Sequence, residues 1–321
     1  MALIAAAYFI PHLLATPRAQ AGTTDDLLKA IAVKDTDGDG LPDWEEALYG
    51  TNPNKVDTFG YGMTDAQAVA KGLIVPKAPT PSATATSTTS GAAASSTPAD
   101  AHVPGTVPAS GSLTEQFAQN FFTQYLAAHQ NGTPLTTDEM TTFVTSAVQQ
   151  LQASQPQQDA FVLSEVKVSG SGQAAMRAYA VAAEQAFVAN TVQTQKSELL
   201  YLNDAISNND ASALDNVSKI ANAYTKIANA LMQIPVPQEL AADHLAVANA
   251  VAQMGSVTNE FAAINRDPIL TSIGLANYGG DVTALSNAFT NLAQAFTNAG
   301  IILKPGDPGY SIVSVTPANG Y

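Results

Sequence analysis

Residues 35–46 read DTDGDGLPDWEE, and this stretch decides how the N-terminal part of the 321-residue chain folds. Counted from Asp35, side chains that carry oxygen stand at positions 1, 3, 5, 9 and 12, and a glycine stands at position 6. This is the spacing of a twelve-residue calcium loop, in which a backbone carbonyl at position 7 also faces the ion. The alternative interpretation is an acidic, solvated turn. The loop predicts one Ca²⁺ ion with the ligands Asp35, Asp37, Asp39, Leu41 (through its carbonyl), Asp43 and Glu46.

The loop pattern returns 22 residues later in a damaged form. Asp57 and Asp65 keep two of its acidic positions, whereas Phe59 and Tyr61 replace two carboxylates and Ala68 replaces the closing glutamate. We therefore expect no second ion in this loop. We expect the two aromatic side chains to pack over the first loop, and it stays open whether Asp57 reaches the first ion.

The run DTDGDGLPDWEEALYGTNPNKVDT resembles the EF-hand-like, thrombospondin type 3-like repeats of exported bacterial proteins, in which Gly-Thr-x-Pro separates two acidic loops. The resemblance covers about residues 35–65 and implies calcium ligands at the same positions of the first loop. Pro42 stands at position 8, where paired calcium-sensor loops bond to each other through a backbone N–H that proline lacks. We therefore expect a structural calcium clip and not a sensor.

Composition excludes some classes of partner. The chain has 27 acidic and 13 basic residues, a formal net charge of −14, and only 12% charged residues. Nucleic acids and anionic membrane surfaces are bound through an excess of lysine and arginine, so neither is expected as a partner. The chain contains no cysteine, which rules out disulfides and thiolate metal sites.

The first 21 residues indicate export. An apolar run too short for a spanning helix is interrupted by Pro11, and Ala19-Gln20-Ala21 fits a small-x-small cleavage site. No basic residue precedes the apolar run, so an uncleaved membrane anchor is the alternative to a signal peptide. In both cases the expected location is extracellular, at the cell surface or periplasmic.

The remaining chain predicts a mainly α fold with a disordered linker. A Pro/Ser/Thr/Ala-rich stretch lacks the large apolar residues needed for a core. The expected organisation is a signal peptide or anchor (1–21), a helix-loop-helix calcium module (22–75), the linker (76–111), a helical bundle (112–304) and a tail (305–321) for which we favour disorder.

Apolar residues at spacings of three and four predict an antiparallel bundle of about five to six helices. Residues 157–170 are ambiguous between a short strand and an irregular turn, and Gly279-Gly280 should interrupt the last helix. The expected helices cover about residues 112–131, 136–155, 173–208, 214–231, 237–261 and 268–296.

The bundle shows no motif of known chemistry. His244 lies on an apolar helix face near Glu239, but no second metal ligand has the right spacing, so a packed core histidine is the expected role. Glu184 and Glu198 are expected on solvated faces. The run IPVPQELAADHL at 234–245 faintly resembles uncharacterised exported bacterial proteins, which adds no activity.

Three functions follow as hypotheses. The first is an exported, non-catalytic calcium-binding protein whose bundle contacts an unknown protein or envelope component. The second is an enzyme that uses His244 and Glu239. The third is a protein that holds an apolar ligand inside the bundle.

Overall fold

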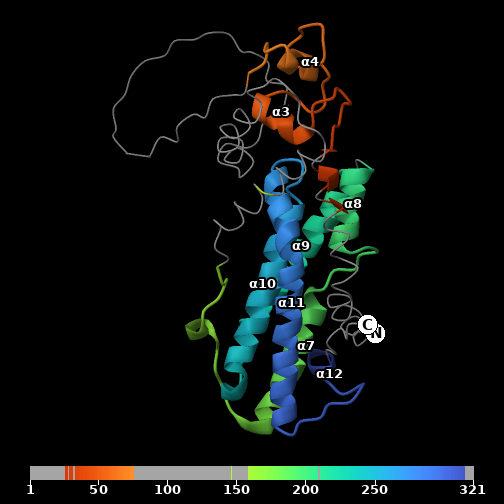
Figure 1. Ribbon diagram of the computed structural model, residues 1–321. Coiled ribbons are helices and arrows are strands. Elements are labelled where there is room, and N and C mark those ends of the chain that lie inside the picture. Colours follow the sequence, from red (N-terminus) through yellow and green to blue (C-terminus); the bar gives the residue numbers. More distant parts are fainter. Residues whose placement is uncertain are drawn as a thin grey trace, which may run out of the picture. The chain divides into compact units, whose positions relative to one another are not determined.

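The computed structural model describes residues 26–27, 29–31, 33–75, 146, 158–208 and 210–314. The described chain is mainly helical and belongs to two compact units, one formed by residues 32–140 and one by residues 1–31 with 141–321 (Figure 1). The expected targeting segment, the linker and the first two expected bundle helices lie outside the described residues, apart from Ser146, which is helical and exposed. None of the described helices is both long enough and apolar enough to cross a membrane.

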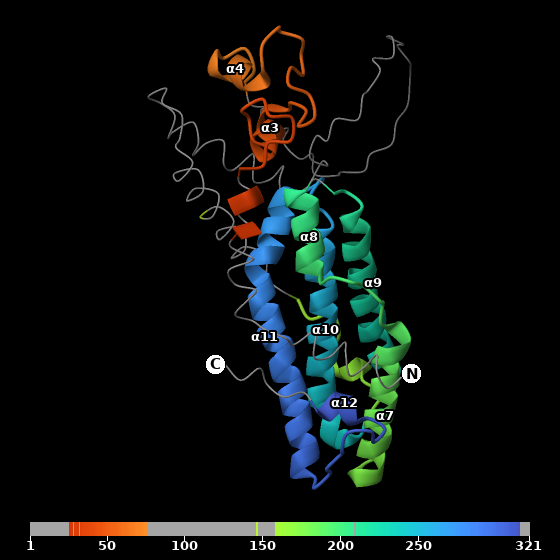
Figure 2. The ribbon, with the colours of Figure 1, turned by 90° about the vertical axis from the view of Figure 1, so that its right-hand side faces the viewer.

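The larger unit is a helical bundle, as predicted. The long helices α9, α10 and α11 lie side by side, and short links join them, so consecutive helices run antiparallel (Figures 1 and 2). The helices are α7 (Gly172–Asn190), α8 (Glu198–Ser207), α9 (Ala213–Leu231), α10 (Ala241–Phe261), α11 (Pro268–Asn298) and α12 (Tyr310–Val313), with the 3-10 turns η1 (Leu163–Glu165) and η2 (Gln238–Leu240).

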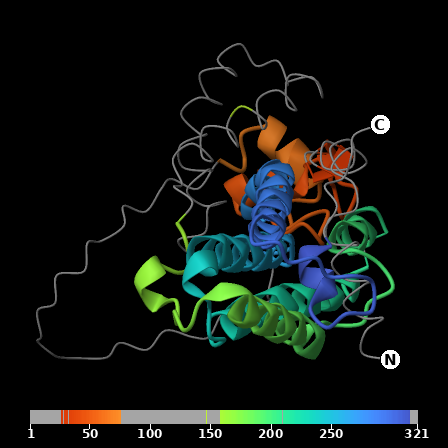
Figure 3. The same cartoon turned by 90° about the horizontal axis from the view of Figure 1, so that it is seen from below.

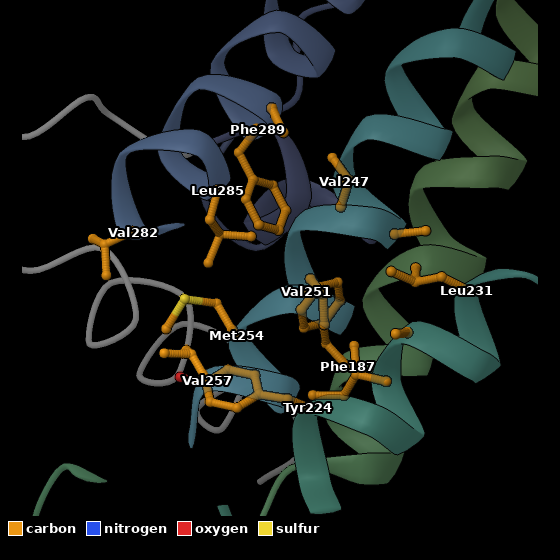
Figure 4. Close-up of a cluster of buried hydrophobic side chains, with 14 of the residues drawn as sticks. Phe187, Tyr224, Leu231, Val247, Val251, Met254, Val257, Val282, Leu285 and Phe289 are labelled. Atoms are coloured by element: carbon orange, nitrogen blue, oxygen red, sulfur yellow. The ribbon is translucent and has the colours of Figure 1, made fainter. Parts of the chain in front are cut away.

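The core of the bundle is centred on α10. Val247, Val251 and Met254 recur at the predicted spacing of three and four residues, and each is at most 1% exposed. They lie close to Leu285 and Phe289 of α11, which are also fully buried (Figure 4). Burial of one such side chain contributes about 1.5–3 kcal/mol, so this seam is a main source of bundle stability. Leu27 and Ile31, near the N-terminus, belong to the same hydrophobic core.

The single helix predicted over 173–208 is two helices in the structure, α7 and α8. The break begins at Thr191, whose backbone is extended and whose hydroxyl donates to the carbonyl of Phe187 at 2.7 Å. Ser197, also extended, precedes α8. A β-branched residue whose hydroxyl binds the preceding turn weakens a helix, and the sequence pattern did not reveal this stop.

The interruption predicted at Gly279-Gly280 is wrong, because α11 continues through both glycines for 31 residues. Asp267 caps the helix start by accepting the N–H of Leu270 at 3.1 Å. Tyr278 and Val282, on either side of the glycines, are buried. Two glycines cost a helix about 1 kcal/mol each, and the packing of these neighbours outweighs that cost.

The ambiguous stretch before α7 is irregular with one strand-like contact. Val168 and Val236 form an isolated parallel bridge, in which Ser169 N donates to the carbonyl of Val236 at 2.8 Å. The N–H of Gly172 then donates to the Glu239 carboxylate at 2.7 Å, and this bond fixes the start of α7.

Glu198, expected on a solvated face, is buried at 6% exposure. Its carboxylate accepts the hydroxyl of Tyr278 at 2.7 Å and that of Tyr224 at 3.4 Å. The expectation was wrong because the residue faces two tyrosines from other helices, which a pattern read along one helix cannot show.

Glu184 is also buried, and it holds the C-terminal segment in place. Its carboxylate accepts the N–H of Gly309 at 2.8 Å and both the N–H and the hydroxyl of Ser311. Helix α12 therefore packs against α7, with Ile312 only 1% exposed (Figure 2). The prediction of disorder is wrong for residues 305–314, and residues 315–321 lie outside the described part.

His244 is fully buried and pairs with a tyrosine. Its Nδ1 lies 3.1 Å from the hydroxyl of Tyr179, and the two rings meet edge to face. Burial lowers the pKa of His244 to about 4. Glu239 accepts the N–H of Gly172, so each of the two catalytic candidates has a structural partner of its own.

We predict that Glu184→Gln releases the C-terminal segment. The variant places an amide nitrogen among N–H and hydroxyl donors, so the free energy of unfolding should fall by about 1–3 kcal/mol. The amides of Gly309 and Ser311 should exchange hydrogen faster than in the unmodified protein. Asp215→Asn, at an exposed position of α9, is the control and should leave both measurements unchanged. Unaltered exchange in Glu184→Gln would contradict the assignment.

We predict that His244 makes the bundle sensitive to mild acid. Its folded pKa of about 4 lies below its unfolded value of about 6.5, so the unfolded chain binds more protons between these values and stability is lost as the pH falls. From pH 7 to about pH 4.5 the loss should be about 2–3 kcal/mol. Denaturant titrations at several pH values measure the free energy of unfolding of the protein and of His244→Phe. The loss of stability between pH 7 and about pH 4.5 should be smaller in the variant by this amount. An equal pH dependence of the two proteins would refute the role of His244.

Candidate metal centre

The acidic loop leads directly into helix α3 (Asp43–Tyr49). The N–H of Asp43 donates to the carbonyl of Lys34 at 2.7 Å, which closes the loop. Gly50 ends α3 in the left-handed conformation, at φ 71°. Because Glu46 lies one turn into this short helix, it is carried back toward the acidic loop.

Asp35, Asp37 and Asp39 form a cluster in which one carboxylate oxygen from each lies within 4.8 Å of the others. Backbone N–H groups hold these side chains in place. Asp35 accepts the N–H of Gly38 and of Gly40, each at 2.9 Å. Both glycines have positive φ angles, which favour glycine, so the backbone can curl around the carboxylates.

Asp39 and Leu41 are part of the interior of the module. Asp39 is 7% exposed and accepts the N–H of Leu41 at 2.7 Å. It also accepts, at 3.3 Å, the N–H of Ala66 in the second helix, α4 (Asp65–Ala70). This contact joins the two loops of the module. Leu41 and Trp44 are each 3% exposed.

Glu46 is a fully buried carboxylate beside the cluster. Its Oε1 accepts the hydroxyl of Thr51 at 3.2 Å. Burial, together with the negative charge of Asp37, raises the pKa of the Glu46 carboxyl to about 9, and burial also raises the pKa of Asp37. Among the residues that the structure describes, Glu46 Oε2 and Asp37 Oδ2 have no hydrogen-bond partner.

These features fit a hard cation. All available side-chain donors are carboxylate oxygens, which Ca²⁺ prefers, and two of the oxygens are buried without a partner. A buried charge needs a counter-charge or a hydrogen bond, because the interior solvates it poorly. A divalent cation would supply the missing positive charge.

Asp43, the predicted ligand at position 9, does not face the cluster. Its Oδ1 accepts the N–H of Thr36 at 2.8 Å, and its Oδ2 accepts the Thr36 hydroxyl at 2.7 Å and an ammonium proton of Lys34. Asp43 therefore braces the two ends of the loop. The sequence does contain the partner of Asp43, since Thr36 follows Asp35 directly. The spacing rule for calcium loops does not include this threonine, so the bond was not predicted.

The second loop repeats this brace. Asp65 is fully buried and accepts the N–H of Thr58 at 2.9 Å and its hydroxyl at 2.6 Å. Asp57 accepts the N–H groups of Tyr61 and Gly62 at 2.9 and 2.8 Å. The two loops thus share one backbone frame, although carboxylates gather only in the first.

Phe59 and Tyr61 stand on the outside of the second loop. They are 50% and 47% exposed, and their ring centroids lie 6.0 Å apart. The expectation that both rings pack over the first loop is wrong. The turn that directs the amides of this loop toward Asp57 leaves these rings on the surface.

Comparison with known proteins agrees with this geometry. Residues 35–56 match the family model described as Bacterial TSP3 repeat. Neither the comparison with curated proteins nor the comparison with solved structures found a match. The matched residues contain the acidic cluster, α3 and Thr51. The chain therefore carries at residues 35–56 a bacterial thrombospondin type 3 repeat, a calcium-binding kind of repeat.

Proposed function

We propose that this is an exported, non-catalytic protein in which one Ca²⁺ ion clips the N-terminal module and the helical bundle contacts other envelope or surface components. The observation that carries the calcium part is the pair of buried, unpartnered oxygens, Asp37 Oδ2 and Glu46 Oε2, next to three converging aspartates. Carboxylate repulsion of this kind is relieved by a divalent cation.

The ion is held by the side chains of Asp35, Asp37, Asp39 and Glu46 and by the carbonyl of Leu41. Asp43 supports the site without binding the ion, because its bonds to Thr36 and Lys34 fix the ends of the loop. When bound, the cation neutralises the clustered charge and ties α3 to the loop. The same chemistry makes the module resistant to local unfolding.

A structural role is supported over a sensor role. Pro42 lacks the N–H through which paired sensor loops bond. Leu41 and Trp44 are already buried inside the module. A sensor must expose an apolar surface when it binds calcium, whereas here the apolar residues beside the loop form the module's own core.

The remaining parts of the proposal rest on composition and on the repeat. Bacterial repeats of this type are typical of exported proteins. The deficit of basic residues argues against nucleic acid as the partner of the bundle. Several ionisable side chains inside the bundle support its fold: Glu184 anchors α12, Glu198 binds two tyrosines, and His244 pairs with Tyr179. This leaves protein contact as the function that we assign to its outer faces.

We predict that chelation destabilises the N-terminal module and that calcium restores it. At about 100 times the dissociation constant, calcium should add roughly 2.7 kcal/mol to the stability of the module. Trp44 is the only tryptophan and lies in the loop region, so its fluorescence during a calcium titration reports the site directly. Magnesium serves as the control ion. A flat titration, confirmed by calorimetry, would overturn the calcium proposal.

We predict that Asp37→Asn and Glu46→Gln each abolish the calcium response. Neither should destabilise the chelated module, because each replaces a carboxyl group that stands among other carboxyl groups and keeps one buried oxygen without a hydrogen-bond partner. Asp57→Asn is the matched control from the second loop and should retain the full response. Loss of the response in Asp57→Asn would show that this residue also reaches the ion.

We predict the opposite pattern for Asp43→Asn. This variant weakens the brace to Thr36 and Lys34, so it should lower the stability of the module by about 1–2 kcal/mol with or without calcium. The calcium-dependent increment in stability should survive. Thermal unfolding of Asp43→Asn in chelator and in saturating calcium measures both quantities, and disappearance of the increment would restore Asp43 as a direct ligand.

A further inference from the structure

A groove runs along the pair of helices α10 and α11. Its volume is about 660 Å³, and on α10 it reaches from Ala242 to Ser256, which is about 20 Å of helix. Its walls consist mainly of small and amide side chains, among them Ala246, Asn249 and Ala250 of α10 and Ala284, Ala288 and Asn291 of α11. Such a surface can accept large apolar side chains between its alanines.

The helices that form the groove are unusually poor in charge. Neither α10 nor α11 contains a lysine or an arginine, and the 31 residues of α11 include only one acidic residue, Asp281. By contrast, the 19-residue helix α9 carries Asp215, Lys219 and Lys226. A helix face that stays in water normally carries charged residues, so this composition indicates a covered face.

The chain itself enters the groove at one point. Gln158, Asp159 and Ala160 line it. Phe161, next to them, forms two hydrogen bonds with the groove residue Asn249. The N–H of Phe161 donates to Asn249 Oδ1 at 2.9 Å, and Asn249 Nδ2 donates to the carbonyl of Phe161 at 3.1 Å. The segment that contains these residues, yellow-green in Figure 3, lies beside α10. Gln158, where this described segment begins, therefore lies at the groove.

The preceding residues have the pattern that the groove requires. The helix predicted over 136–155 has an apolar stripe of Met140, Phe143, Val144, Ala147, Val148 and Leu151. The stripe extends over about 17 Å, close to the length of the groove. No charged residue occurs between Met140 and Gln155, and glutamines flank the stripe. Ser146, which the structure describes as helical and exposed, falls outside the stripe.

We propose that the helix over residues 136–155 docks in the groove between α10 and α11, with its apolar stripe against the alanines and its glutamines beside the amides. The link to the groove is only Pro156-Gln157, so the helix meets its site as part of the same molecule. A short tether gives an effective concentration in the millimolar range, which favours this occupant over a separate protein or a second copy. The proposal does not depend on calcium binding.

Engineered disulfides test this docking, because the 321-residue chain has no cysteine of its own. Val144→Cys or Val148→Cys is combined in turn with Ala246→Cys, Ala250→Cys, Ala284→Cys or Ala288→Cys. The four groove positions are spaced by one turn on each helix, so a docked stripe brings some pair within the 4.4–6.8 Å Cα separation that a disulfide needs. Unchanged thermal unfolding of each variant under reducing conditions establishes that it is folded.

The expected result is an intramolecular disulfide in at least one pair, seen as faster migration on a non-reducing gel. Ser146→Cys, combined with the same four groove cysteines, is the matched control and should form none. Disulfide-linked dimers would show that a second copy fills the groove and would overturn the proposal. Equal crosslinking from Ser146→Cys, or no crosslink from any folded pair, would overturn it as well.

Discussion

Hydrogen bonding of carboxylates by backbone N–H and hydroxyl groups is the interaction on which both units of this protein depend. With only 13 basic residues in 321, the chain has few ammonium or guanidinium groups to place beside its buried acids. Glu184 is satisfied by the backbone and hydroxyl of the C-terminal segment, Glu198 by two tyrosines and Asp65 by Thr58. Ion pairs are found at Lys34–Asp43 and Lys196–Asp204.

The acidic loop differs from the other carboxylate environments named above because three aspartates converge in it. Asp35 and Asp39 are supplied with amides in the usual way of this chain, but Asp37 and Glu46 each keep a buried oxygen that receives none. Both oxygens lie at the cluster of aspartates, within the residues that match a repeat of the calcium-binding type. The physical argument and the family resemblance thus converge on one place.

The sequence was sufficient to predict features with a strict local spacing. The acidic cluster, the course of α9 and α10 and the cap at Asp267 all follow from patterns within a few turns of chain. It was insufficient where a residue is determined by a distant partner. Glu184 meets Gly309 across 125 positions, and Glu198 meets Tyr278 across 80, so their burial could not be seen from their own helices. The bond of Asp43 to Thr36 could not be predicted for a related reason: Thr36 lies outside the spacing rule that identified the loop.

The brace between Thr36 and Asp43 has a kinetic consequence. Together with the amides that hold Asp35, it sets the curvature of the loop, and the second loop keeps the same hydrogen bonds where carboxylates are replaced by aromatic rings. A binding site whose backbone is already arranged has little conformational entropy left to lose on binding. Uptake of Ca²⁺ would then need little change of the backbone, but it would release a proton from Glu46, because burial and Asp37 raise the pKa of that carboxyl to about 9. An ion bound there would therefore exchange without unfolding of the loop, since the hydrogen bonds that shape the loop do not involve the ion.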